Sequence, residues 1–127
     1  MSHEEERLRQ QMASIGARYL TRTLGELTRI GELLAQVTGG SSTAPKELQH
    51  AAHKIHGSGA MFGFHELSER AREVEHIAGH LASGDGPEHL RALDHEELRR
   101  RLAASVAQLD ETTRSTARNL GLDGNVG

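Results

Sequence analysis

The chain has 127 residues, the length of one domain, and a net charge of −3 with histidine counted as neutral. It contains no cysteine, which excludes disulfides, thiol catalysis and cysteine-ligated zinc. Aromatic residues make up only 2% of the chain, which argues against an all-β fold and against nucleic-acid modules that stack bases on aromatic side chains. Because the chain has no strong basic field, we expect neither nucleic acid nor a membrane as a partner.

The N-terminal segment is charged and has no apolar core, so it does not resemble a secretory signal. No apolar run approaches the roughly 18 residues that a membrane-spanning helix needs. We therefore expect a cytoplasmic location.

The first helical region is predicted over residues 4–37, because apolar residues recur there at helical spacing. The residues that mark its inner face are Leu20, Leu24, Leu27 and Leu34. A break is predicted near Ser14 to Gly16, since glycine lowers helix stability. This break would leave a short N-terminal extension helix before the long one.

Three further amphipathic helices are predicted over residues 45–62, 65–81 and 94–120, and Asp94 is suited to cap the last of them. The segments between them are short and contain glycine and both prolines. The predicted fold is therefore all-α, an antiparallel up-down four-helix bundle. We expect residues 1–122 to form a single domain and residues 123–127 to form a flexible tail.

The second predicted helix carries the most specific signal. At about 100° per residue, Ala52 and Ile55 lie on its inner face and His53 lies about 140° from the direction of Leu48, toward solvent. Gly57 follows one turn later on the exposed face, where glycine weakens a helix without improving its packing. We infer that a partner approaches closely there. An exposed imidazole is a competent nucleophile near neutral pH.

This segment resembles the phosphoacceptor motif of the histidine phosphotransfer (HPt) domains of bacterial phosphorelays. The residues that match the motif in register are His53, Ile55, Gly57, Ser58, Gly59, Gly63 and Leu67. The resemblance implies a four-helix bundle with His53 as its exposed phosphoacceptor. It also implies a phosphohistidine carrier, which takes the phosphoryl group from a receiver-domain aspartate and passes it to another receiver domain. We expect no autokinase activity, because the sequence shows no glycine-rich ATP-binding motif.

The resemblance assigns roles to residues near His53. Glu75 stands where family members often place a Glu or Gln that hydrogen-bonds the imidazole, so we expect it to orient His53. The family usually has lysine three residues after the phosphoacceptor, where this chain has His56. We expect His56, with help from Lys54, to stabilise the phosphoryl group. Transfer or phosphohistidine lifetime should then depend on pH between about 6 and 7.5.

The partners implied by the resemblance are the receiver domain of a hybrid sensor histidine kinase, response regulators, or both. We expect no cofactor on this chain, and Mg²⁺ only on the partner receiver domain. The expected docking surface consists of Lys46, His50, Gly57, Ala60 and Met61.

Two alternatives remain open from the sequence. The first is a helical adaptor that binds receiver or kinase domains without being phosphorylated. The second is a histidine-rich metal-binding bundle, since His76 and His80 are four residues apart and Glu73 precedes His76 by three. A second Glu-x-x-His copy and further inward carboxylates are missing, so we expect no metal site.

Overall fold

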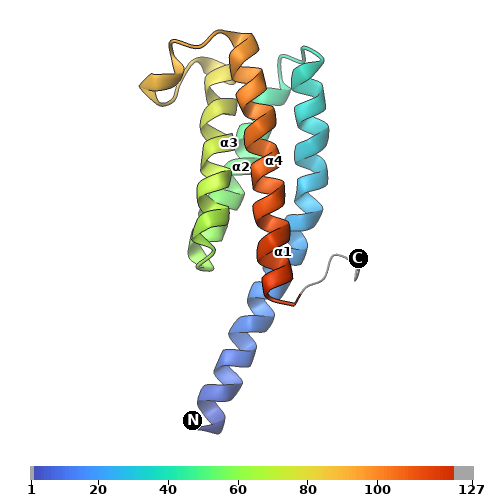
Figure 1. Cartoon of the computed structure of the whole chain (residues 1–127), viewed down its shortest axis with the longest axis vertical. Helices are drawn as coiled ribbons and strands as arrows, with labels where there is room; N and C mark the ends of the chain where they lie inside the picture. The colour runs from blue at the N-terminus through green and yellow to red at the C-terminus, as the bar shows by residue number, and fades with distance from the viewer. Residues whose placement is uncertain (1, 122–127) are drawn as a thin grey trace.

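The computed structural model describes residues 2–121, and every regular element in that range is helical (Figure 1). The long helices are α1 (His3–Thr38), α2 (Ala44–Met61), α3 (His65–Ser83) and α4 (His95–Asn119), with a short 3-10 helix η1 (Glu88–Leu90) before α4. The predicted all-α class is confirmed, whereas η1 was not predicted. The predicted domain end at residue 122 and the flexible tail at 123–127 lie outside the described residues and stay predictions.

The four long helices form an up-and-down bundle in which successive helices run in opposite directions (Figure 1). α1 packs against α2 and α4, and α3 packs against the same two helices from the other side. Each helix presents apolar side chains every three or four residues toward the centre. The largest fully buried apolar side chains are Leu20, Ile30, Leu33, Leu48, Ile55, Leu67, Val74, Leu98, Leu102 and Leu109.

The predicted break near Ser14 to Gly16 is wrong, because α1 is one continuous helix. Gly16 is buried, and a Cβ built on it would lie 3.4 Å from the Phe64 ring, so the helix is packed where the break was expected. This packing offsets the helix cost of about 1 kcal/mol for a glycine. The expected extension is therefore the N-terminal part of α1 itself, which projects beyond the bundle (Figure 1).

Local signals at the helix ends agree with the structure. The Asp94 side chain accepts a hydrogen bond of 2.8 Å from the Glu97 backbone N–H, as expected of an N-cap. Pro45 occupies the first turn of α2, where its missing N–H costs nothing. Gly63 has a φ of +83°, a left-handed conformation that lets the chain turn from α2 into α3. The turn at Gly63 joins α2 to α3, the two helices that carry the predicted site.

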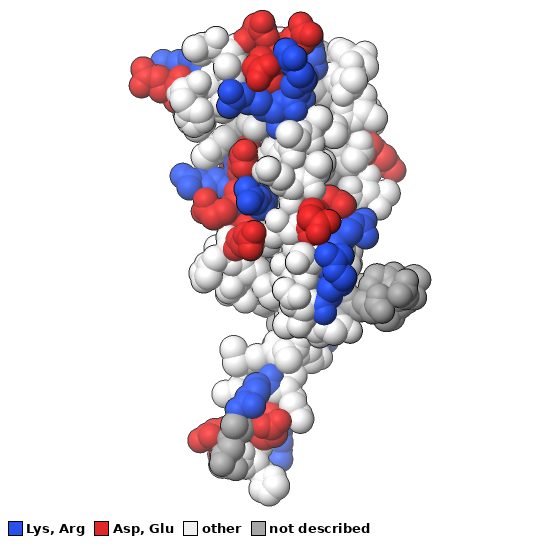
Figure 2. All heavy atoms as spheres, viewed as in Figure 1, with Lys and Arg blue, Asp and Glu red and all other residues white. Residues whose placement is uncertain are grey.

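Apolar side chains gather where the projecting part of α1 leaves the bundle. Tyr19 stacks on Phe62 and Phe64 there, with ring centroids 4.7 and 5.7 Å apart. An open hollow at this end contains all the exposed large apolar side chains of residues 2–121, namely Leu8, Met12, Ile15, Met61, Phe62 and Leu120. Elsewhere charged side chains of both signs are mixed, as Figure 2 shows for one face. Within residues 2–121, no helix is long and apolar enough to cross a membrane.

Candidate functional site

His53 lies in the middle of α2 and faces outward, because the residues on either side of it along the inner face, Ala52 and Ile55, are buried in the core. Its side chain is 68% exposed. The ring is nevertheless held from one side, since its Nδ1 atom lies 2.7 Å from Oε2 of Glu75 on α3. The structure thus brings together the two residues that the resemblance paired, 22 positions apart in the chain.

Glu75 contacts a second imidazole as well. Its other oxygen, Oε1, lies 3.0 Å from Nδ1 of His56, and the Glu75 side chain is only 17% exposed. An ionised carboxylate can only accept hydrogen bonds, so each histidine donates from Nδ1. When the His53 ring is neutral, its lone pair is therefore on Nε2, the nitrogen that Glu75 does not engage.

The charge of Glu75 is stabilised by its two neighbours. Burial by itself raises the pKa of the Glu75 carboxyl, but hydrogen bonds from His53 and His56, together with their charge, outweigh burial and lower the pKa below its ordinary value. A carboxyl with a lowered pKa stabilises the fold above the pKa it has in the unfolded chain. That contribution is lost as the pH falls through the lowered value.

We therefore expect the stability difference between the parent and Glu75→Gln to depend on pH. The parent should keep its advantage at pH 7 and 5 and lose it progressively below about pH 4.5, where the carboxyl becomes protonated. Urea denaturation at several pH values measures this difference. Glu69→Gln, on the exposed face of the same helix, corrects for the change in net charge. A difference that stays constant from pH 5 to pH 3 would contradict the assignment.

Three side chains hold the backbone of α2 where His53 is mounted, and sequence reasoning gave none of them this role. The Ser68 hydroxyl donates to the His56 carbonyl at 2.7 Å, and the Tyr19 hydroxyl donates to the Ile55 carbonyl at 3.4 Å. The Ser58 hydroxyl donates to the Lys54 carbonyl at 2.7 Å and lies 2.9 Å from the Tyr19 hydroxyl. These contacts tie a glycine-containing stretch of α2 to α1 and α3. The one sequence feature that could have indicated such a role is Tyr19, because it is the only tyrosine of the chain.

The five predicted docking residues are all exposed on α2, and Lys54 is exposed beside them. Lys46, His50, His53, Gly57 and Ala60 follow one another at intervals of four, three, four and three residues, which places them on one face of the helix. Met61, at the end of this face, is 81% exposed. A Cβ built on Gly57 would have nothing within 4 Å, so the surface beside His53 is open.

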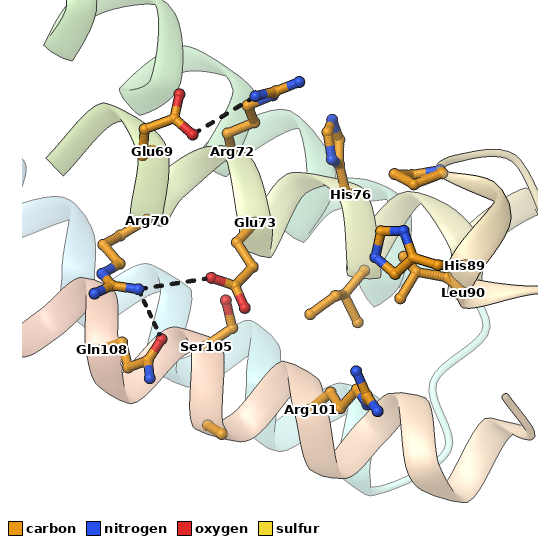
Figure 3. Close-up of a pocket in the computed structure, with 13 residues that line it drawn as sticks. Glu69, Arg70, Arg72, Glu73, His76, His89, Leu90, Arg101, Ser105 and Gln108 are labelled. Carbon is orange, nitrogen blue, oxygen red and sulfur yellow. Dashed lines mark hydrogen bonds and ion pairs between the residues drawn. The ribbon is translucent and has the colours of Figure 1, made fainter. Parts of the chain in front are cut away.

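A second hollow lies between α3 and α4 and contains no predicted site residue. Arg70, Glu73 and Gln108 meet across it, with Arg70 donating to Gln108 at 3.3 Å (Figure 3). His76, from the predicted metal pair, lines this hollow, whereas His80 does not. Within residues 2–121, neither histidine belongs to a group of three side chains placed to hold a metal.

The chain belongs to the Hpt domain family, whose model matches residues 17–112. Hpt domains are phosphohistidine carriers of two-component signalling and are generally not enzymes. The matched range includes α2, α3 and all residues of the predicted site. No curated protein and no solved structure matched the chain significantly.

Proposed function

We propose that the protein is a phosphorelay intermediate that accepts a phosphoryl group on His53 from a receiver-domain aspartate and passes it to another receiver domain. The observation that carries this proposal is the 2.7 Å contact between His53 Nδ1 and Glu75 Oε2 on an otherwise exposed ring. It keeps the proton on Nδ1 and leaves the Nε2 lone pair facing outward. Membership of the Hpt domain family supports the same role.

The transfer step follows from this tautomer. The Nε2 lone pair attacks phosphorus of the aspartyl phosphate, the N–P bond forms, and the bond between phosphorus and the aspartate oxygen breaks. The aspartate leaves as a carboxylate. The ring gains positive character, which the Glu75 carboxylate stabilises through Nδ1. In this proposal Mg²⁺ binds to the receiver domain. This chain supplies the nucleophile, binds no cofactor for the transfer and has no autokinase activity.

A receiver domain would dock along the exposed face of α2 from Lys46 to Met61. Lysine and histidine side chains at one end of this face suit the acidic surroundings of a phosphorylated aspartate, and Lys54 lies beside it. The exposed Met61 leads into the apolar hollow at the end of the bundle. A contact of such limited extent is typical of transient signalling pairs.

The test is phosphoryl transfer from a panel of phosphorylated receiver domains to the full chain, followed by a chase with a second, unphosphorylated receiver. We expect a label on this chain that is acid-labile and alkali-stable and that decreases as the second receiver becomes labelled. Binding of a receiver without any label would contradict the relay and establish the adaptor alternative.

His56→Lys tests the residue that replaces the usual family lysine. In the parent, His56 is 31% exposed and donates Nδ1 to Glu75, so only its other ring nitrogen is available to a phosphoryl group. We expect the transfer rate or phosphohistidine lifetime of the parent to change between about pH 6 and 7.5, and the pH profile of His56→Lys to differ from it because lysine stays protonated over this range. Identical profiles for the two proteins would show that His56 has no such role.

A further inference from the structure

Three potential metal ligands meet at the predicted phosphoacceptor site. His53, His56 and Glu75 each offer one ligand atom, and these atoms all lie within 4.8 Å of one another. Within residues 2–121 no other group of three or more histidine, aspartate or glutamate side chains is placed in this way. Two separate helices supply the group, α2 both histidines and α3 the glutamate.

The donor set is suited to a transition metal. Two imidazoles and one carboxylate are the protein ligands of many open zinc sites, in which water takes the fourth position. With metal–ligand bonds of about 2.0–2.2 Å, neighbouring ligand atoms in a tetrahedral site are roughly 3.3 Å apart. The two contacts of Glu75, at 2.7 and 3.0 Å, involve different carboxylate oxygens. To accept an ion they need to widen by roughly 0.3–0.6 Å, and the three ligand atoms, which lie within 4.8 Å of one another, need to converge on it. The half-buried His56 and the largely buried Glu75 are already held in place.

We propose that His53, His56 and Glu75 form a binding site for a divalent transition-metal ion, with Zn²⁺ as its probe, and that the ion competes with phosphoryl transfer. The carboxylate supplies negative charge and both rings supply neutral nitrogen. Hard Mg²⁺, which prefers an all-oxygen shell with several waters, is a poor match for this set. The site therefore favours a transition-metal ion over the Mg²⁺ that the receiver domain would use.

The competition follows from the tautomers and rests on the proposed function. A metal ion on Nδ1 of His53 displaces the proton that this nitrogen carries, and a neutral ring then carries its proton on Nε2. The nitrogen that attacks phosphorus would no longer have a lone pair. The metal-bound protein is therefore unable to accept a phosphoryl group until the ion leaves.

His56 makes the inference specific to this chain. A lysine at that position would place an ammonium group, which has no lone pair, where the structure has an imidazole within reach of Glu75. Only two of the three ligands would remain, and the positive charge would repel a cation. His56→Lys thus removes the metal site while His53 and Glu75 stay in place.

The binding test is calorimetric titration of the full chain, without an affinity tag, with Zn²⁺ alone at pH 7.5. We expect one tight equivalent in the parent, and at least a tenfold weaker affinity in His56→Lys and in Glu75→Gln. His50→Gln and His76→Gln are matched controls, because both histidines lie on the same two helices outside the group. The absence of a tight equivalent, or an unchanged affinity in His56→Lys, would overturn the proposal.

The competition test measures phosphoryl transfer from a receiver domain with and without Zn²⁺, each protein compared with its own metal-free rate. We expect Zn²⁺ to suppress transfer to the parent at least tenfold more than transfer to His56→Lys, whereas an effect through the receiver would be equal in both. Equal suppression in the parent and in His56→Lys would overturn the proposed competition between the metal ion and phosphoryl transfer. If the parent binds Zn²⁺ but no receiver labels it, the metal site stands and the relay is refuted. Failure of the metal site and failure of the proposed function are therefore distinguishable.

Discussion

Replacing His53 with glutamine is expected to abolish labelling of this chain by a phosphorylated receiver domain. Glutamine has no ring nitrogen with a lone pair, so the proposed N–P bond has no acceptor atom. The side chain of His53 is 68% exposed and makes a polar contact with Glu75, so the change removes no core packing. The measurement is the label retained after transfer, with thermal unfolding to show that the variant is folded.

His50→Gln is the matched control for this experiment. His50 lies one turn earlier on the same exposed face of α2, so its replacement makes the same chemical change at a neighbouring position. We expect His50→Gln to become labelled on histidine, at a rate lowered only by the loss of one docking side chain. Label that survives in His53→Gln would assign the phosphoacceptor to another of the nine histidines.

The second large effect is expected from Gly57→Leu, which should slow phosphoryl transfer by about 100-fold, since small displacements of reacting groups cost rates of this order. Side chains on a helix lean toward its N-terminus, so a leucine at position 57 would cover the His53 ring. The fold should be intact or slightly more stable. A Cβ at Gly57 meets nothing within 4 Å, and leucine favours a helix over glycine by up to about 1 kcal/mol. Transfer kinetics with urea denaturation check both expectations.

Gly59 is the contrasting position, two residues further along α2. A Cβ there would lie 3.1 Å from Leu67 Cδ2 and 3.4 Å from the Ser68 backbone, so Gly59→Leu should destabilise the bundle. We thus expect Gly59→Leu to lose both phosphoryl transfer and stability, whereas Gly57→Leu should lose transfer and keep its stability. Unfolding of Gly57→Leu would assign Gly57 to packing, and unchanged transfer in the folded variant would contradict the docking geometry.

The helices could be predicted from the sequence because their signals are local. The spacing of apolar residues, the Asp94 cap and the glycine after α2 each depend on neighbours within a turn or two. The same reasoning placed His53 outward, because its direction follows from its angle to the buried Ala52 and Ile55. A break in α1 was predicted because the sequence shows the cost of a glycine in a helix. It does not show the packing of Gly16 against Phe64, which keeps α1 continuous.

The sequence by itself determined the all-helical class, the approximate helix ends and the exposure of the His53 face. The resemblance to a known motif, and not periodicity, paired Glu75 with His53. Only the tertiary structure showed that Glu75 bridges both His53 and His56, and that Tyr19, Ser58 and Ser68 hold the backbone beneath them. The physical reason is that spacing along one helix sets the direction of each side chain, whereas distances between helices depend on how the whole core packs.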